Sequence, residues 1–447
     1  MMKTILLSVF ALMGCCTATR ADVEINETNF PDANFRNYLL RRAYGKDGVL
    51  TNAEIAGVTS ISVISKNIQS LKGIEYFTAL TGLQCSDNQL TELDVSQNTA
   101  LTRLECWLNQ LTELDVPKNT ALTTLSCGGN MLTALDVSQN TALTELDCNN
   151  NKLTALDVSQ NTALTELDCS NNKLTALDVS KNTALTQLWC EKNQLTALYV
   201  SKYTALTLLW CYGNQLTELD VSKNTALTTL RCEKNKLKAL NVSGCTALTM
   251  LVCYGNLLTE LDVTKNTALT DFNCWHNKLT ALDVSKNTAL TELHCDSNRL
   301  VALNVSQNTA LTKLSCAGNR LTELDVSKNI ALRELLCFCN QLTKLDVSGC
   351  TVLKVLACYN NQLTALDVSQ NTALRLLECN QNQIKGAAMD ALVESLPTVS
   401  KCDMYIISNK KEQNVMTTVQ VKAAKAKGWT PYAWVDGNEK KYKGSKR

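Results

Sequence analysis

The chain of 447 residues is poor in aromatic residues, in histidine and in net charge. Aromatics make up 5% of the sequence, so Leu, Val, Ala and Cys are expected to fill the core. The chain has only two histidines, and its formal net charge is +1. This near-neutral balance gives no indication of a nucleic-acid or anionic-membrane partner. Beyond the N-terminal residues, no apolar run is long enough to cross a membrane.

The first 21 residues have the pattern of an export signal. Lys3 precedes an apolar run, Ile5 to Gly14, that is too short to span a bilayer as a mature helix. Two cleavage positions are compatible with this signal. The stretch Leu12-Met13-Gly14-Cys15 resembles a bacterial lipobox, which would leave Cys15 lipidated, whereas Thr19-Arg20-Ala21 suits ordinary signal peptidase cleavage. Export is therefore expected, with either a lipid anchor or free secretion.

A 21-residue unit occupies most of the remaining chain. One copy, from Leu90 to Gln110, is Leu-Thr-Glu-Leu-Asp-Val-Ser-Gln-Asn-Thr-Ala-Leu-Thr-Arg-Leu-Glu-Cys-Trp-Leu-Asn-Gln. Its cysteine recurs fifteen times in steps of 21, from Cys85 to Cys379, and an asparagine always follows three residues later. A fixed period of this length predicts a stacked solenoid, because no single unit can bury its apolar side alone.

Each unit has two extended halves. In one copy, Leu101, Leu104, Cys106 and Leu111 follow the pattern Leu-x-x-Leu-x-Cys-x-x-Asn-x-Leu, which predicts a strand of a parallel sheet around the cysteine. The other half, residues 90–98, also alternates and is too rich in Val, Thr, Ser and Asn for a helix. With extended chain on both sides of the solenoid, neighbouring coils have nearly the same spacing on the two sides. We therefore expect a weakly curved solenoid with a shallow binding face.

The 21 cysteines of an exported protein would normally indicate disulfides. On stacked strands, however, cysteines lie about 4.8 Å apart with parallel side chains, and a disulfide needs converging Cβ vectors. We therefore expect free thiols that pack as small hydrophobes. Cys245 and Cys350 occupy a slot that usually holds asparagine, and five repeats separate them, too many for pairing.

An N-terminal cap is expected over residues 22–70, before the array of residues 71–383. The segment Phe30–Phe35 predicts a helix start, with Phe35, Leu39 and Leu40 facing inward. Residues 47–54 match part of an EF-hand loop through Asp47, Gly48 and Glu54, but the first ligand positions carry no suitable side chain. A structural helix–turn–helix is the favoured interpretation, and calcium binding is the alternative.

A C-terminal cap of mixed α and β type is expected over residues 384–447. The pattern predicts helices over 386–396 and 415–427 and strands over 403–408 and 429–435. The basic tail from Lys440 to Arg447 is expected to be a solvated end.

A repeat position that carries the same residue in nearly every copy, here called a column, is expected to have a structural role. The asparagine after each cysteine is expected to bond backbone groups of its turn and of the next coil. An aspartate column that begins at Asp94 is interrupted by Tyr199, Asn241 and Asn304. Because asparagine keeps the acceptor but not the charge, these aspartates are expected to accept hydrogen bonds rather than to bind cations.

Repeat positions whose residue differs between copies are not required for stacking the coils. Residues that bind a ligand are therefore expected at these positions. The outward positions that flank the cysteines hold four of the six tryptophans and both histidines. These candidate ligand-binding residues are Trp107, Trp189, Trp210, Tyr212, Tyr254, Trp275, His276, His294, Phe338 and Tyr359. A recognition surface is the favoured interpretation, and aromatic ladders that only stabilise the sheet are the alternative. The acidic residues Glu145, Asp147, Glu166 and Asp168 of the same slots are expected to form a solvated face.

No constellation for catalysis, metal or cofactor is present in the sequence. There is no Ser-His-Asp motif, no glycine-rich phosphate loop and no zinc-ligand spacing. The two histidines are expected to lie roughly 10 Å apart along the strand direction. A non-enzymatic protein without a cofactor is therefore expected.

The repeat Leu-Thr-x-Leu-Asp-Val-Ser-x-Asn-Thr-Ala-Leu-Thr-x-Leu-x-Cys-x-x-Asn resembles the cysteine-laddered leucine-rich repeats of internalin-J-like bacterial surface proteins. The resemblance covers the array and implies a cell-surface or secreted adhesin for a host, bacterial or matrix protein. No cell-wall anchoring motif or stalk domain follows the repeats in this sequence. This favours either a lipid anchor at the outer membrane or cell surface, or free secretion. A carbohydrate-binding surface lipoprotein and a self-associating biofilm protein stay open as alternatives.

Overall fold

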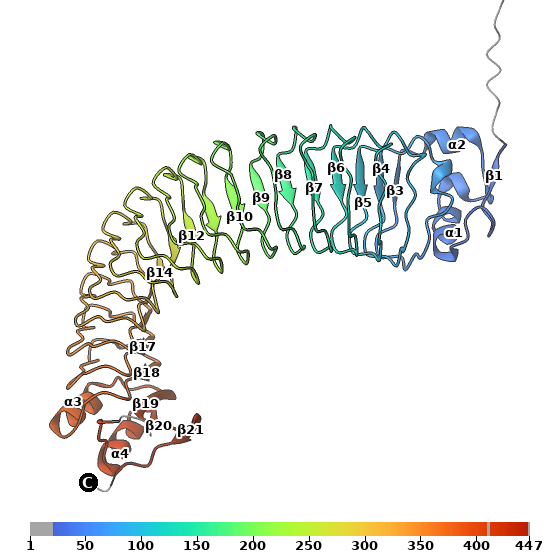
Figure 1. Cartoon of the computed structure of the whole chain (residues 1–447). Helices are drawn as coiled ribbons and strands as arrows, with labels where there is room; N and C mark the ends of the chain where they lie inside the picture. The colour runs from blue at the N-terminus through green and yellow to red at the C-terminus, as the bar shows by residue number, and fades with distance from the viewer. Residues whose placement is uncertain (1–20, 409–411, 446–447) are drawn as a thin grey trace, which may run out of the picture.

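One long parallel sheet extends along the chain in the computed structural model, which describes residues 21–408 and 412–445 (Figure 1). Its repeated strands are three residues long, and each pairs with the next; Leu188 of one strand, for example, is in register with Leu209 of the following strand. The strands of the array are β3 Ser60–Ser62, β4 Gly82–Gln84, β5 Arg103–Glu105, β6 Thr124–Ser126, β7 Glu145–Asp147, β8 Glu166–Asp168, β9 Gln187–Trp189, β10 Leu208–Trp210, β11 Thr229–Arg231, β12 Met250–Val252, β13 Asp271–Asn273, β14 Glu292–His294, β15 Lys313–Ser315, β16 Glu334–Leu336, β17 Val355–Ala357 and β18 Leu376–Glu378.

Each coil buries the apolar residues of both of its extended halves. Leu104 and Cys106 beside the strand are fully buried, and so are Leu90 and Val95 in the outer segment. No helix interrupts the outer segments between residues 90 and 380. A solenoid with a parallel sheet and non-helical outer segments is therefore confirmed.

The solenoid is nearly straight from β3 to about β9 and bends between β10 and β18 (Figure 1). The straight half agrees with the weak curvature that extended chain on both sides predicts. The second half bends more than this spacing argument gives, with its strands toward the inner side of the bend. The strand face of the second half is therefore concave.

The asparagine three residues after each ladder cysteine joins consecutive coils. The Nδ2 atom of Asn172 donates to the carbonyl oxygens of Cys148 and Cys169 at 3.0 and 3.2 Å, and its Oδ1 accepts from the Leu153 amide at 3.0 Å. Because Asn172 is buried, it satisfies backbone groups that water does not reach. The predicted structural role is confirmed, with the preceding coil as the partner rather than the next one.

A second asparagine column lies in the outer half of the coils. Asn161 is fully buried, and its Nδ2 donates to the carbonyl oxygens of Val137 and Asn140, both at 2.9 Å. Cys245 takes this slot in one coil, and its Sγ donates to the Val221 carbonyl at 3.1 Å. A thiol can therefore replace one of the two amide bonds, which explains its presence in this slot.

The aspartate column forms short turns on the outer segments. The Oδ1 atom of Asp94 accepts a hydrogen bond from the Ser96 amide at 2.8 Å, and this bond lowers the pKa of the Asp94 carboxyl. Asn241 makes the equivalent bond to the Ser243 amide at 3.0 Å. The predicted role as hydrogen-bond acceptors is confirmed, because the amide does what the carboxylate does.

The cysteine ladder consists of free thiols. All fifteen ladder cysteines are fully buried, and the cysteines of the described chain form no disulfide. Burial raises the pKa of the Cys148 thiol well above its usual value, so the ladder packs as apolar groups, as expected.

The N-terminal cap covers the first coil with two short helices. The cap contains β1 Val23–Glu24, α1 Ala33–Leu40, the 3-10 turn Ala43–Gly45, β2 Val49–Leu50 and α2 Asn52–Gly57, and the 3-10 turn Ile74–Tyr76 follows β3. Asp32 caps α1 through the amides of Asn34 and Phe35, and its other oxygen accepts from the Gln69 amide at 2.7 Å. This carboxylate therefore fastens the cap to the array.

One helical residue of the cap points the other way from the prediction. Phe35 and Leu39 are buried, but Leu40, which was expected to face inward, is 37% exposed. Residues four apart share a helix face, whereas Leu40 lies five residues after Phe35 and turns away from the core.

The C-terminal cap continues the sheet rather than only covering its edge. It contains α3 Ala387–Ser395, β19 Cys402–Ser408, α4 Thr418–Ala426, β20 Trp429–Val435 and β21 Asn438–Lys441. β19 pairs in parallel with β18, and β20 pairs in parallel with β19. Residues in register on β18 and β19, such as Leu377 and Met404, are 27 positions apart instead of 21. These last coils therefore carry a helix where the earlier coils have extended chain, and helices need about 8–10 Å of lateral space.

Part of the basic segment forms a strand, which was not predicted, while its lysine side chains are exposed to solvent as predicted. Lys440 and Lys441 belong to β21, which pairs antiparallel with β20. Their side chains are exposed. A charged edge strand is a common protection against pairing with other chains.

The bond between coils can be tested at Asn172. Replacing it with alanine leaves the Leu153 amide without a partner, whereas the Cys148 carbonyl still accepts from Asn151. The substitution should therefore destabilise the protein by about 1–3 kcal/mol. Urea denaturation followed by circular dichroism measures this change. Lys173→Ala, at an exposed neighbouring position, is the control and should change the midpoint little. Equal midpoints for both variants would contradict the proposed role.

Candidate functional site

The ten candidate residues lie along the strand face at three positions of the repeat. Trp189, Trp210 and His294 each end a strand. His276 lies in the turn two residues after the cysteine, with φ of 54°, and this turn position has positive φ in every coil of the array. The other six follow a ladder cysteine directly: Trp107, Tyr212, Tyr254, Trp275, Phe338 and Tyr359.

The first aromatic group surrounds an arginine. The rings of Trp210 and Tyr212 are 6.4 Å apart, and the Arg231 guanidinium lies 5.2 and 4.7 Å from their centres. Arg231 also forms an ion pair with Glu233, whose side chain is fully buried. Trp189 lies beside Trp210 on the adjacent strand. Cation–π contacts and the ion pair thus hold a positive charge among the rings.

The second group lies two coils further along. Tyr254 and Trp275 stack with their centres 5.0 Å apart, and Trp275 contacts the His276 ring at 5.7 Å. The Nζ atom of Lys234 is 5.9 Å from the Tyr254 ring. Trp275 is 39% exposed, so this group offers more apolar surface to solvent than the first.

The third group is the stacked pair Phe338 and Tyr359, whose nearly parallel rings are 4.4 Å apart. His294, between the second and third groups along the array, stands apart from these stacks, with its Nε2 3.6 Å from a carboxylate oxygen of Glu292. The structure therefore brings eight of the ten candidates, all except Trp107 and His294, into three separate groups rather than one continuous stripe.

The C-terminal cap adds rings that the sequence alone did not identify. Tyr405 stacks on Tyr432 at 5.4 Å and on Trp434 at 5.5 Å. The strands that carry these rings were predicted, but not their continuation of the array's sheet. The period-2 alternation of 403–408 and 429–435 is the signal that could have placed these rings on the same face.

Trp107 and Trp189 lie at the two ends of a shallow hollow of about 400 Å³ on the strand face. The acidic side chains Glu145, Asp147, Glu166 and Asp168 line it between the tryptophans. None of these four carboxylates forms an ion pair within the described residues. Burial and, to a lesser extent, the charge of Asp168 raise the pKa of Asp147, so this member of the acidic patch is less solvated than predicted.

Glu191 is an unusual carboxyl between the acidic patch and the first aromatic group. Its side chain is buried, and its Oε2 atom has no hydrogen-bond partner among the described residues. Burial is the main cause that raises the pKa of Glu191 to about 7. The carboxyl therefore changes charge near neutral pH.

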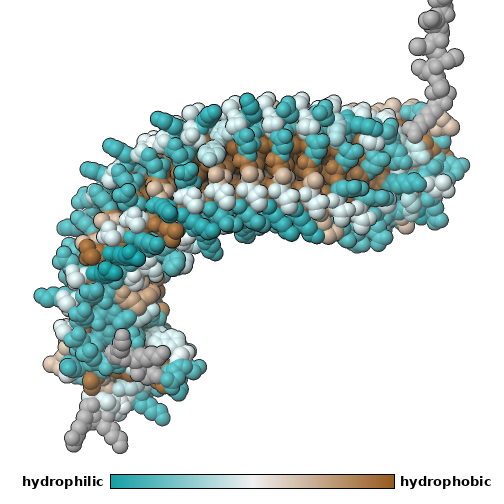
Figure 2. All heavy atoms as spheres, viewed as in Figure 1, coloured by the Kyte–Doolittle hydropathy of each residue, from teal (hydrophilic) through white to brown (hydrophobic). Residues whose placement is uncertain are grey.

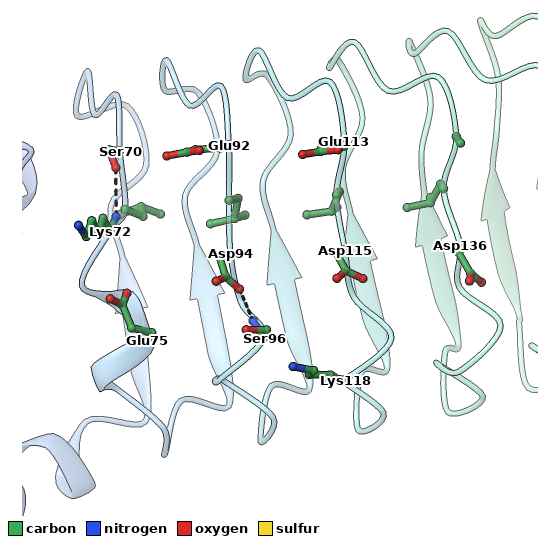
Figure 3. Close-up of a pocket in the computed structure, with 15 residues that line it drawn as sticks. Ser70, Lys72, Glu75, Glu92, Asp94, Ser96, Glu113, Asp115, Lys118 and Asp136 are labelled. Atoms are coloured by element: carbon green, nitrogen blue, oxygen red, sulfur yellow. Dashed lines mark hydrogen bonds between the residues drawn. The ribbon is translucent and has the colours of Figure 1, made fainter. Parts of the chain in front are cut away.

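Further hollows lie over the outer segments. One of about 780 Å³ has a floor of Leu93, Leu114 and Leu135. Figure 3 shows Glu92 and Glu113 in one row and the column aspartates in another, with Asp94 bonded to Ser96. Figure 2 shows an apolar stripe between polar rows along the N-terminal half of the solenoid. None of the ten candidates lines this hollow.

The EF-hand-like segment has its side chains engaged in local structure. The Glu54 carboxylate accepts from the amide and the hydroxyl of Thr51 in a capping box at the start of α2. Asp47 accepts from the Val49 amide at 3.1 Å. These contacts support the structural interpretation. No group of three or more metal-ligating side chains occurs in residues 21–408 and 412–445.

The predicted lipidation site, Cys15, lies outside the described residues, as does nearly all of the predicted signal. Within the part that the structure describes, no helix has both the length and the apolar character needed to cross a membrane.

The charge of Glu191 predicts a pH-dependent stability. Folding raises its pKa from 4.5 to about 7, so folding favours the neutral form and the stability that this gives is lost as pH rises through about 7. Glu191→Gln should raise the urea midpoint at about pH 8, with little difference at about pH 4.5. Glu92→Gln, an exposed change, serves as the control. A pH-independent gap between Glu191→Gln and wild type would refute this account.

Comparison with known proteins identifies the repeat. The family "Leucine Rich repeats (2 copies)" matches residues 141–182, and no curated protein matches the chain. Among solved structures, the functional domain of InlJ from Listeria monocytogenes, described as including a cysteine ladder, is 38% identical with a TM-score of 0.72, and the match covers 87% of this chain and 82% of that chain.

Two further structures support the fold alone. An internalin, InlF, from Listeria monocytogenes is 24% identical with a TM-score of 0.63, covering 73% of this chain and 99% of that chain. A leucine-rich-repeat protein of Leptospira interrogans is 24% identical with a TM-score of 0.62, covering 79% and 97%. The extent of the match to InlJ, together with the shared ladder, shows that the chain belongs to the internalin-like family of leucine-rich-repeat proteins.

Proposed function

We propose that this protein is a non-enzymatic adhesin that binds a protein on a host cell, on another bacterium or in extracellular matrix. The internalin-like leucine-rich-repeat fold is consistent with a protein-binding module. The observation that carries the proposal is the set of aromatic groups on the strand face from Trp189 to Tyr359. Aromatic and arginine side chains are the residues that most often dominate the energy of protein interfaces.

The arrangement of these groups favours recognition over sheet packing. Arg231 lies over two rings, which presents a charge within an apolar surface. Trp275 keeps 39% of its surface exposed although Tyr254 stacks against it. A ring that served only to stabilise neighbouring strands would gain more from fuller burial. The concave second half of the solenoid carries most of these rings, which suits a partner that lies along the trough.

Removing one exposed and one half-buried ring of the strand face should weaken adhesion without unfolding the chain. Trp275→Ala combined with Phe338→Ala should lower binding to the protein partner at least tenfold, since interface hot spots contribute about 2 kcal/mol or more each. Binding of the full chain to immobilised fibronectin, laminin, collagen and fibrinogen, and to fixed epithelial and bacterial cells, measures the effect.

The control for this test is Tyr199→Ala. Tyr199 is 74% exposed and belongs to the aspartate column of the outer segments, away from the strand face. Its replacement should leave binding unchanged. If the double variant binds as wild type does while its thermal midpoint falls, the rings serve sheet packing and the adhesin proposal is wrong.

Export is part of the same proposal and has its own measurement. When the full gene is expressed in a bacterial host, the mature chain should begin either at a lipid-modified Cys15 or near residue 22. Mass spectrometry of the mature N-terminus separates the lipid anchor from free secretion. A chain that keeps Met1 and stays in the cytoplasm would contradict export.

A further inference from the structure

The last coil of the array lies between two walls of stacked rings. On one side, Phe338 and Tyr359 stack at 4.4 Å, and on the other side Tyr405 and Trp434 stack at 5.5 Å. The strand between the walls, β18, carries Glu378, which is in register with Tyr405 of β19. The small Ala357 occupies the equivalent position of β17. The walls are therefore separated by shorter side chains, which leaves a cleft.

A hollow of about 280 Å³ occupies this cleft. Its lining consists of Tyr359, Glu378, Asn380, Gln381, Ser408 and Trp434. The lining comes from both the array and the cap, so the hollow exists only because the cap continues the sheet. Its volume lies just below the range of typical ligand pockets, which begins at about 300 Å³, so the hollow suits a single small ring rather than a folded protein surface.

Two polar side chains of the lining lack partners within the described chain. Asn380 is 4% exposed, yet its Oδ1 atom accepts no hydrogen bond. The Glu378 side chain makes no hydrogen bond or ion pair, and burial raises the pKa of its carboxyl. A buried acceptor without a donor costs about 1–3 kcal/mol. A ligand that brings hydroxyl groups would supply the missing donors.

The chemistry of the hollow favours a sugar over a cation. Besides Glu378, the polar groups are neutral amides and a hydroxyl, and the raised pKa of Glu378 disfavours its charged form. The rings of Tyr359 and Trp434 offer flat apolar faces, and Trp434 is 38% exposed. A pyranose combines apolar C–H faces with hydroxyl groups around its edge, which matches both features.

We propose that the cleft between the last repeat and the C-terminal cap is a carbohydrate-binding site, with Tyr359 and Trp434 contacting the sugar face and Glu378 and Asn380 bonding its hydroxyls. This site shares Tyr359 with the adhesin surface, but its other lining residues lie outside the aromatic groups over β9 to β13 that carry most of the adhesin proposal. With this site, the protein would bind glycans at its C-terminal end in addition to a protein partner.

The site can be tested with defined glycoconjugates. The full chain should bind at least one member of a panel of polyacrylamide conjugates that carry glucose, galactose, mannose, fucose, N-acetylglucosamine or N-acetylgalactosamine. Trp434→Ala and Glu378→Ala should each lower that binding about tenfold. Among the described residues, neither the Glu378 nor the Trp434 side chain makes a hydrogen bond, so neither substitution removes one there. Biolayer interferometry with immobilised conjugate is the measurement.

Two controls keep the outcome decisive. Tyr199→Ala, which removes an exposed ring of the outer segments away from the strand face, should bind the conjugate as wild type does. A (Gly-Lys)₅ peptide tests the cationic alternative and should not bind in a Glu378-dependent way. The proposal is overturned if no conjugate binds above the unsubstituted polymer, if binding persists in Trp434→Ala and Glu378→Ala, or if only the peptide binds.

Discussion

Every coil of the array is bound to the preceding coil through the side-chain amide of a buried asparagine. Asn172 bonds two backbone groups of the coil before it and one of its own turn, and its counterparts do the same along the array. Without this bond, the irregular turn after each strand would bury polar groups that have no partner. Three features depend on this bond: the regular step of 21 residues, the in-register pairing of the strands and the buried leucine core.

This constraint also decides where the molecule can vary. The inward leucines, the cysteine and the asparagines are fixed by stacking, so only the outward positions beside each strand are free to differ between coils. The structure uses this freedom for rings and charges: Arg231 among aromatic rings, acidic side chains toward Trp107, and stacked pairs further on. The turn residue after these positions is less free, because its positive φ favours Gly, Asn and Asp. His276 is therefore positioned by this left-handed turn and not by the strand.

The solenoid, its ladders and the free thiols could be predicted because each depends on a repeated local rule. The predictions were wrong or missing where the structure depends on contacts between several segments of the chain. Leu40 was assigned inward from its apolar character, although its helix phase turns it outward. Lys440 and Lys441 have exposed side chains as predicted, but their backbone pairs with the edge of β20, which the sequence pattern did not indicate. The cleft at Trp434 could not be foreseen, because it needs the 27-residue step that brings cap strands beside β18. The bend of the second half in Figure 1 likewise could not be predicted from the repeat, because the 21-residue step is the same in both halves.

The direction of the bonds between coils has a mechanical consequence. The strand pairs and the asparagine bonds run along the long axis of the solenoid, from each coil to the preceding one. A force that pulls the two ends apart therefore acts on one interface after another, and the weakest terminal coil detaches first. Each detached coil releases 21 residues, about 70 Å of extended chain, while the remaining coils keep their structure. A solenoid tethered at one end and loaded at the other would lengthen in such steps before its bound surface was lost.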